Sequence, residues 1–278
     1  MPNKAAQSDS QDMTSITHVK MTHSPVAPDW WTYQTSAKSN KQFDQEVCEE
    51  ELAASQFAVA KYILAHPEYI VVHEGLSEIW SSAEIDPEKE ITQQIRTHFN
   101  KETFDKEFDE LSPEQKALLR GRHGAPILLY LGLLDTLYPS ASLETTEKLV
   151  HDINSLRSNY GSLIDIEQKF RETREKEAII LSKCAADETG VRKVLLVYGG
   201  IHNLEDAVEQ LDDETIVLEK PVDLSQVLPQ NTHKESLNTN LAVNQFNFWS
   251  DSPKKAFTIY GDTKSEKNDD ATNKTKPT

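Results

Sequence analysis

The sequence predicts an α/β fold in which a small, mostly parallel sheet is covered by helices, with a long helical insertion between its central strands. Two short, continuous apolar runs, Tyr69–His73 and Val191–Tyr198, have the composition of strands that are buried on both faces. Segments with helical periodicity lie before, between and after these runs. Because strands that alternate with helices pair in parallel through helical crossovers, this order favours a single parallel sheet.

The other elements follow from local signals, taken in chain order. Apolar residues at helical spacing indicate a helix over 42–66, which His66-Pro67 ends. Ser112-Pro113-Glu114 places an N-cap, a proline and an acid at the start of another helix. The remaining predicted elements are a charged helix over 86–108, an apolar helix over 125–138, helices that start at 142, 163 and 203, and a short strand over 214–218.

Both ends of the chain are polar and have little periodicity. We therefore expect a flexible N-terminal leader over 1–28, an α/β domain over 29–220 and a largely disordered tail over 221–278. A short strand over 16–21 is an option within the leader. Two aromatic segments of the tail, Val243–Trp249 and Ala256–Tyr260, could dock on the domain or on a protein partner.

Charge and composition exclude some partners and locations. The chain has 46 acidic and 29 basic residues, a formal net charge of −17, which opposes binding to nucleic acid and to anionic lipid. Its longest apolar run, over 125–134, is shorter than the roughly 20 residues that cross a bilayer. The first residues contain no apolar signal-peptide core, and the two cysteines form no disulfide framework. These features predict a cytoplasmic protein, and the alternative is export by a route that uses no signal peptide.

The two predicted central strands end in residues that can carry chemistry. Glu74-Gly75 follows the first strand, and Gly199-Gly200-Ile201-His202 follows the second. Because ligands of open parallel sheets bind at the carboxyl ends of the strands, we expect Glu74 and His202 to share a crevice. A carboxylate and an imidazole there could bind a metal or share acid–base work. The alternative is that Glu74 caps the following helix and that His202 is a loop histidine near a helix N-terminus.

A cation in the long helix over 163–187 is the third candidate. Arg174 lies in a run of alternating charges, and its guanidinium could orient a carboxylate or hold a substrate anion. The alternative is a solvated helix face on which Arg174 forms ion pairs at i,i+3 and i,i+4 spacing.

Four segments together resemble the superfamily of TraB/PrgY-like, TIKI-type, ChaN-like and erythromycin-esterase-like proteins. The segments are 55–75, which ends in His73-Glu74-Gly75, then Arg122–Gly132, Arg174-Glu175 and Val194–His202, and the similarity spans about residues 30–218. The resemblance implies that Glu74 and His202 are site residues, supported by Arg174. Members of the superfamily include metal-dependent peptidases, an esterase and a haem-binding protein, so the fold does not fix the function.

One motif of that superfamily is missing at the position that we prefer for it. The family has a GxxH-type motif at the end of its first strand, but Trp30–Lys38, the preferred first strand, contains no glycine or histidine. This assignment leaves Gln34, Ser36 or Lys38 where the histidine would be expected. The alternative is that Ile16–His23 is the first strand and His23 the histidine, at the expense of a long connection to the next helix.

The missing histidine bears on metal binding. Glu74 and His202 alone would supply two of the three protein ligands that a catalytic zinc takes. His73 could add a third only if the chain turned, because neighbouring residues of a strand point to opposite faces.

Two functions from different classes remain open. The first is a hydrolase that acts on a small molecule, an ester or a peptide, with Glu74 as the general base and His202 as its partner or as a ligand; its cofactor is unknown, and a divalent transition metal is the candidate. The second is a non-catalytic member that binds a ligand or a protein with the same pocket. A haem-binding variant of it would use Tyr198 or His202 as the axial ligand. A scaffold whose tails bind partners is a third possibility.

Overall fold

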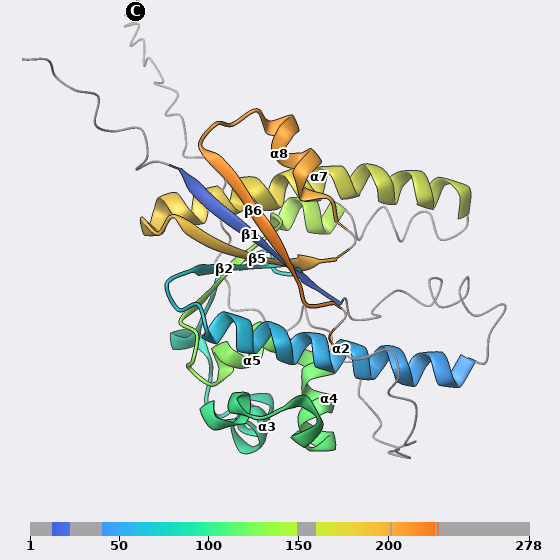
Figure 1. The fold of residues 1–278 in the computed structure, drawn as a ribbon, viewed down its shortest axis with the longest axis vertical. Coiled ribbons are helices and arrows are strands. Elements are labelled where there is room, and N and C mark those ends of the chain that lie inside the picture. The colour runs from blue at the N-terminus through green and yellow to red at the C-terminus, as the bar shows by residue number, and fades with distance from the viewer. Residues whose placement is uncertain (1–12, 23–40, 149–159, 201, 226, 228–278) are drawn as a thin grey trace, which may run out of the picture.

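A six-stranded, mostly parallel sheet is the centre of the computed structural model, which describes residues 13–22, 41–148, 160–200, 202–225 and 227 (Figure 1). The strand order among these residues is β3-β4-β2-β5-β1-β6, and only β3 runs antiparallel to its neighbour. This confirms the predicted fold class. The strands are β1 (Thr14–Met21), β2 (Ile70–His73), β3 (Trp80–Ser81), β4 (Thr136–Pro139), β5 (Lys193–Gly199) and β6 (Ile216–Asp223).

The two strands that the sequence identified most clearly, β2 and β5, are neighbours in the middle of the sheet. Their apolar side chains point alternately to the two faces, as the period of a strand requires. On β5, Leu195 and Val197 enter one hydrophobic cluster, whereas Val194, Leu196 and Tyr198 enter the other. A strand buried on both faces therefore accounts for the continuous apolar run.

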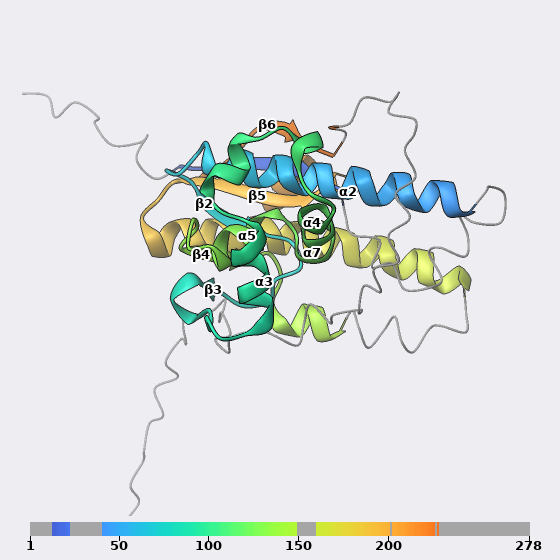
Figure 2. The same cartoon turned by 90° about the horizontal axis from the view of Figure 1, so that it is seen from below.

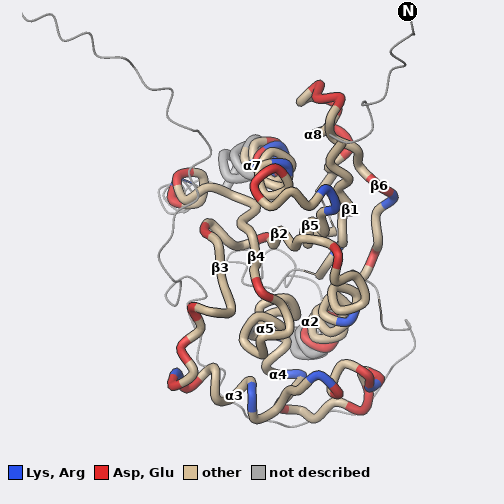
Figure 3. Tube along the Cα trace, turned by 90° about the vertical axis from the view of Figure 1, so that its left-hand side faces the viewer, with Lys and Arg blue, Asp and Glu red and all other residues tan. Residues whose placement is uncertain are grey.

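Helices cover both faces of the sheet, which gives three layers (Figures 1 and 3). One face packs against α7 and α8, and the other packs against α2 and α5, with α3 and α4 beyond them. Figure 2 views these layers from the side of α3 and α4. No helix in the described part of the chain has the length and apolar character needed to cross a membrane. The helices are α2 (Lys41–Leu64), α3 (Glu90–His98), α4 (Pro113–Arg122), α5 (Gly124–Tyr130), α7 (Tyr160–Thr189) and α8 (Leu204–Leu211).

The expected leader over 1–28 is wrong for its second half, because residues 14–21 form β1, which pairs in parallel with β5 and β6. The segment 14–21 is polar in composition, but it contains β-branched residues that favour a strand, and two of them, Ile16 and Val19, are completely buried. The first strand is therefore the alternative segment that precedes His23, not Trp30–Lys38; His23 and residues 30–38 lie outside the described residues.

The chain ends also differ from the predicted boundaries. The last strand, β6, continues to Asp223, beyond both the predicted strand over 214–218 and the domain boundary at 220. Its pairing with β1 extends to Asp223. The sequence alone does not show this pairing, so the strand was predicted to be shorter. The aromatic segments of the tail lie outside the described residues.

The insertion between β2 and β5 is not purely helical. The predicted helix over 125–138 ends at Tyr130, and Gly132 then adopts a φ of 69°, which turns the chain. The segment that follows is β4, which pairs in parallel with β2 and antiparallel with β3. The predicted helix over 86–108 is likewise shorter, because only Glu90–His98 is α-helical and two 3₁₀ turns follow.

The signals at the start of α4 are confirmed as a capping box. Ser112 accepts a hydrogen bond from the backbone N–H of Gln115, whose side chain accepts one from the backbone N–H of Ser112, and Pro113 occupies the first helical position.

The contact between α5 and α2 requires a glycine at the start of α5. The Gly124 N–H donates a hydrogen bond of 3.0 Å to Gln56 Oε1, and a Cβ atom at this position would lie 1.9 Å from the Gln56 carbonyl oxygen. That distance is far inside van der Waals contact with a backbone atom. The two helices can therefore pack as they do only without a side chain at residue 124.

We expect Gly124→Ala to lower the free energy of unfolding by about 3 kcal/mol, because one of the two helices must move. Gly121→Ala in α4 is the matched control, since nothing lies within 4 Å of its Cβ position. This control should be neutral or slightly stabilising, because alanine favours helix more than glycine does. Urea denaturation of both variants measures the difference; equal stability would contradict the described packing of α5 on α2.

Candidate functional site

The carboxyl ends of β2 and β5 adjoin, and the first site residue follows β2 directly. The backbone N–H of Glu74 donates a hydrogen bond of 2.9 Å to the Val197 carbonyl, which continues the pairing of the two strands. Gly75 then adopts a φ of 89°, a conformation that favours glycine, and turns the chain away. The strand pleat sends the side chains of His73 and Glu74 to opposite faces, with the ring of His73 5.8 Å from that of His123.

The Glu74 carboxylate is buried and holds three segments together. Its Oε1 atom accepts a hydrogen bond of 2.6 Å from Arg174 Nη2, and its Oε2 atom accepts one of 2.7 Å from the Gly199 N–H. The Glu74 side chain is only 6% exposed, so its charge depends on these partners rather than on water. The structure thus brings Glu74 and Arg174 together, although 100 residues separate them in the chain.

His202 lies on the other side of the same carboxylate. Its Nδ1 atom donates a hydrogen bond of 2.8 Å to Glu175 Oε1, and its Nε2 atom lies 3.6 Å from Glu74 Oε1. The same Glu175 oxygen accepts a hydrogen bond of 3.1 Å from the Asn203 N–H, which fixes the loop that carries His202. All three predicted residues therefore meet at the strand ends, and the imidazole is held between two carboxylates.

Glu175 was not singled out from the sequence, because the run around it reads as a solvated helix face. In the structure it is 6% exposed and continues a buried stripe of α7 that includes Ala178, Ser182 and Ala185. The spacing of these residues, three or four positions apart, is the signal that could have identified it.

A buried tyrosine lies against the site. Tyr198 is completely buried, its ring is 4.4 Å from the His202 ring, and the Arg174 guanidinium lies 5.9 Å above it. Burial, together with the negative charge of Glu74, raises the pKa of the Tyr198 hydroxyl well above its ordinary value. The phenol therefore stays neutral, and its oxygen has no hydrogen-bond partner among the described residues.

Electrostatics favour the charged form of Arg174. Burial by itself would lower the pKa of Arg174, but the negative charges of Glu74 and Glu175 outweigh it and raise that pKa. Arg174 remains a cation next to two carboxylates. The described site thus pairs its charges internally.

The donor set fits a transition metal poorly. A catalytic zinc takes three protein ligands, and the described residues contain no group of three His, Cys, Asp or Glu side chains arranged to hold a metal ion. Of the two predicted ligands, Glu74 already accepts hydrogen bonds at both oxygens, and both nitrogens of His202 face carboxylates. His73 points to the other face of the sheet. We therefore derive no chemical step through a metal.

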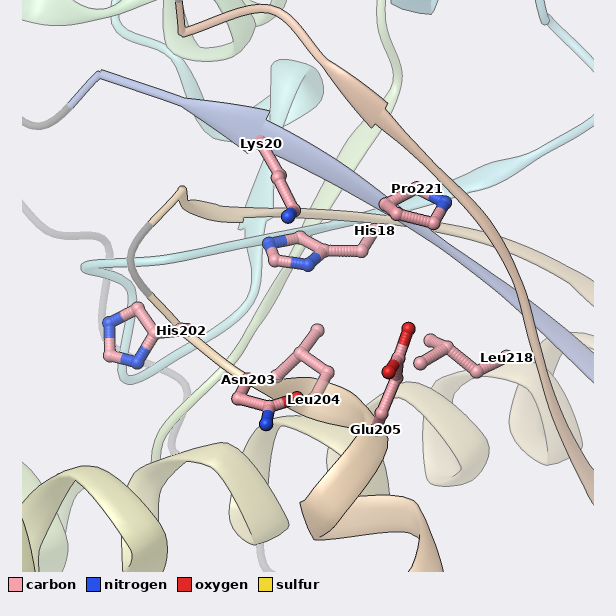
Figure 4. A pocket seen from close by; sticks show the side chains of 8 residues that line it. All are labelled: His18, Lys20, His202, Asn203, Leu204, Glu205, Leu218 and Pro221. Atoms are coloured by element: carbon pink, nitrogen blue, oxygen red, sulfur yellow. The ribbon is translucent and has the colours of Figure 1, made fainter.

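A pocket of about 220 Å³ opens beside His202, between β1, β6 and the start of α8 (Figure 4). His18 and Lys20 line it from β1, and they were missed because β1 was assigned to the leader. The imidazole of His18 is 3% exposed, and its Nε2 atom has no hydrogen-bond partner among the described residues. The lining residues are His18, Lys20, His202, Asn203, Leu204, Glu205, Leu218 and Pro221.

Comparisons with protein-family models, with curated proteins and with solved structures find no match. The resemblance to the TraB/ChaN-like superfamily therefore stays a prediction. The fold and site define an α/β protein with a buried Glu–Arg–His–Glu cluster at the carboxyl ends of its parallel strands.

We expect Arg174→Met to lower the free energy of unfolding by about 3 kcal/mol, because it leaves the buried carboxylate of Glu74 without its cation. Replacing the carboxylate as well, in Glu74→Gln/Arg174→Met, should recover much of this loss. Urea denaturation of the two single variants and the double variant gives the coupling energy. Additive effects would show that the two side chains do not stabilise each other.

The buried imidazole of His18 should make stability depend on pH. Burial, aided by the positive charge of Lys20, lowers the pKa of His18 from 6.5 to about 4. Between those two values the unfolded chain binds a proton that the folded chain does not. The stabilisation is therefore present above pH 6.5 and is lost as the pH falls toward 4, by about 3 kcal/mol in all.

This contribution is isolated by comparing wild type with His18→Gln, which cannot titrate. The free energy of unfolding of wild type should fall by about 3 kcal/mol more than that of the variant between pH 7 and pH 4. Parallel curves for the two proteins would contradict a depressed pKa at His18.

Proposed function

We propose that this chain is a hydrolase of the TraB/ChaN-like type, in which His202 is the general base for the attack of water on an ester or peptide bond. The observation that carries the proposal is the 2.8 Å hydrogen bond from His202 Nδ1 to the buried Glu175 carboxylate, with Nε2 directed toward Glu74. This is the arrangement of a histidine whose tautomer and orientation are set for proton transfer. The pocket that His202 lines supplies the space for a substrate.

Nε2 of His202 takes a proton from water as the water oxygen attacks the carbonyl carbon, and the imidazolium forms between the carboxylates of Glu74 and Glu175. The tetrahedral intermediate then expels the alcohol or amine, which receives the same proton from Nε2. The products are a carboxylic acid and an alcohol or an amine, and His202 returns to its neutral form.

Glu74 takes a different role from the one expected from sequence. Its two oxygens already accept hydrogen bonds from Arg174 and from the Gly199 N–H, so it is less suited to receive a proton than His202 is. We propose that Glu74 supplies a fixed negative charge that stabilises the imidazolium. Arg174 uses only Nη2 on Glu74 in the described contacts, and its other N–H groups could stabilise the oxyanion of the intermediate.

The second candidate is a non-catalytic member that binds a ligand in the same pocket. It is favoured by the way Glu74, Arg174 and the Gly199 N–H satisfy one another without a substrate. The haem-binding variant is less well supported, because Tyr198, one of its two candidate ligands, is completely buried. The scaffold possibility depends on tails that lie largely outside the described residues.

A panel of p-nitrophenyl esters and fluorogenic peptides tests the hydrolase directly. On any substrate that is turned over, His202→Asn should lower kcat by about 10³-fold, because the base is lost. His98→Asn in α3 is the matched control, since this histidine is not part of the site, and it should leave kcat unchanged. Thermal melts of both variants establish that they fold.

Glu175→Gln tests the positioning role of the second carboxylate. An amide can still bind the histidine loop, but it cannot stabilise the imidazolium, so kcat should fall by about 10²-fold while KM changes little. The pH–rate profile should also shift, because the imidazolium that forms in the proposed step loses the adjacent carboxylate charge. An unchanged profile would mean that Glu175 is only structural. If no member of the panel is hydrolysed by wild type while a ligand binds, the non-catalytic candidate prevails.

Removal of divalent metal separates this step from a metal-assisted one. After dialysis against a chelator, we expect kcat and the melting temperature of wild type to stay the same, because Nε2 of His202 performs the proton transfer without a metal. Loss of activity that returns with zinc or manganese would overturn the metal-free step.

A further inference from the structure

The pocket beside His202 is built by three elements, two of which contribute polar groups (Figure 4). His18 and Lys20 are two residues apart on β1, so their side chains point to the same face of the sheet, which is the face that α8 covers. Glu205 lies in the first turn of α8, and Leu218 and Pro221 of β6 form an apolar wall. The pocket is therefore polar at two sides and apolar at the third.

One cationic and one anionic side chain line the pocket and do not form an ion pair with each other. Lys20 comes from β1 and Glu205 from α8, and no described residue forms an ion pair with either of them. The other carboxylate near Lys20 is that of Asp223, which already accepts hydrogen bonds from the N–H and hydroxyl of Ser225. Lys20 and Glu205 thus offer a cation and an anion to whatever enters the pocket.

The pocket also contains a buried nitrogen atom, on His18, that lacks a hydrogen-bond partner among the described residues. His18 is 3% exposed, and its Nε2 atom has no hydrogen-bond partner in the described part of the chain. A buried polar atom of this kind lowers stability unless water or a ligand supplies the missing hydrogen bond. His18 and Lys20 line the same pocket, and Figure 4 shows both side chains on its β1 side, so one small ligand can face both.

We propose that this pocket binds the α-amino acid end of the substrate, with its carboxylate on Lys20 Nζ and its ammonium group donating to Glu205 and to His18 Nε2. A simple anion would face the carboxylate of Glu205, and a simple cation would face Lys20, whereas a small zwitterion complements both sides. The inference rests on the proposed function, because His202 lines the same pocket. With both α-groups held, the bond that is hydrolysed belongs to the side chain, as an O-acyl ester or an ω-amide.

Binding of three small probes to the full-length chain tests the pocket without any turnover. L-alanine carries both charges, propionate only the carboxylate, and ethylamine only the ammonium group. Titrations are followed by the imidazole NMR signals of His18, which are identified by their loss in His18→Gln. L-alanine should shift these signals saturably, and each of the other two probes should bind about tenfold more weakly or worse, since each lacks one charged contact.

Variants assign the two contacts. Lys20→Met and Glu205→Gln should each weaken the binding of L-alanine by about tenfold. Lys193→Met on β5 and Glu209→Gln in α8 are the matched controls, because neither side chain lines the pocket, and they should leave the binding unchanged. Propionate that binds as tightly as L-alanine, no shift of the His18 signals, or no effect of Glu205→Gln would each overturn the proposal.

The two proposals fail separately. If L-alanine binds as expected but no O-acyl or ω-amide amino acid is hydrolysed, the pocket stands and the hydrolase is overturned. If hydrolysis depends on His202 but L-alanine does not perturb His18, the hydrolase stands and the amino acid pocket is overturned.

Discussion

The buried carboxylate of Glu74 is the feature on which the rest of the site depends. It cannot be taken out of water without compensation, and the fold supplies a guanidinium from α7 and a backbone N–H from the end of β5. These bonds link two central strands to the longest helix on one face of the sheet. They also leave the Oε1 atom facing His202, so the same charge that holds the elements together shapes the environment of the imidazole.

Neighbouring positions on β2 show how a strand divides its polar residues between two layers. His73 turns toward α2 and α5, where it lies against His123, while Glu74 turns toward α7. Each face of the sheet therefore has its own polar group near its carboxyl end. In the described part of the chain, the face covered by α7 and α8 combines an ion pair, an oriented histidine and a pocket, and the functional proposals are therefore confined to it.

Polar and charged groups of the site either form hydrogen bonds with one another or face the pocket. Glu74, Arg174, Glu175 and His202 satisfy one another in the buried cluster, where an unpaired charge would lower stability most. Lys20 and Glu205 lie at the more open pocket, where water can solvate them until a ligand arrives. The cluster would perform the proton transfer, and the pocket would select what is presented to it.

The sequence by itself determined the fold class, the two central strands and the meeting of Glu74 with His202, because continuous apolar runs identify buried parallel strands and the carboxyl ends of such strands adjoin. It assigned Arg174 correctly to a long helix, but it could not show that the guanidinium turns inward to Glu74.

Only the tertiary structure decided the place of β1, β4, Glu175 and the pocket residues His18 and Lys20. Residues 14–21 are too polar to be recognised as a central strand until β5 and β6 pair with them on both sides. Most of β4 lies in the apolar segment that was predicted to be a helix, because periodicity alone does not separate a short buried strand from a helix. The sequence around Glu175 predicts a surface charge, and its burial follows only from the packing of α7 on the sheet. For the polar residues the physical reason is the same. Partners that are distant in the chain decide whether such a residue is buried, and the local sequence does not identify those partners.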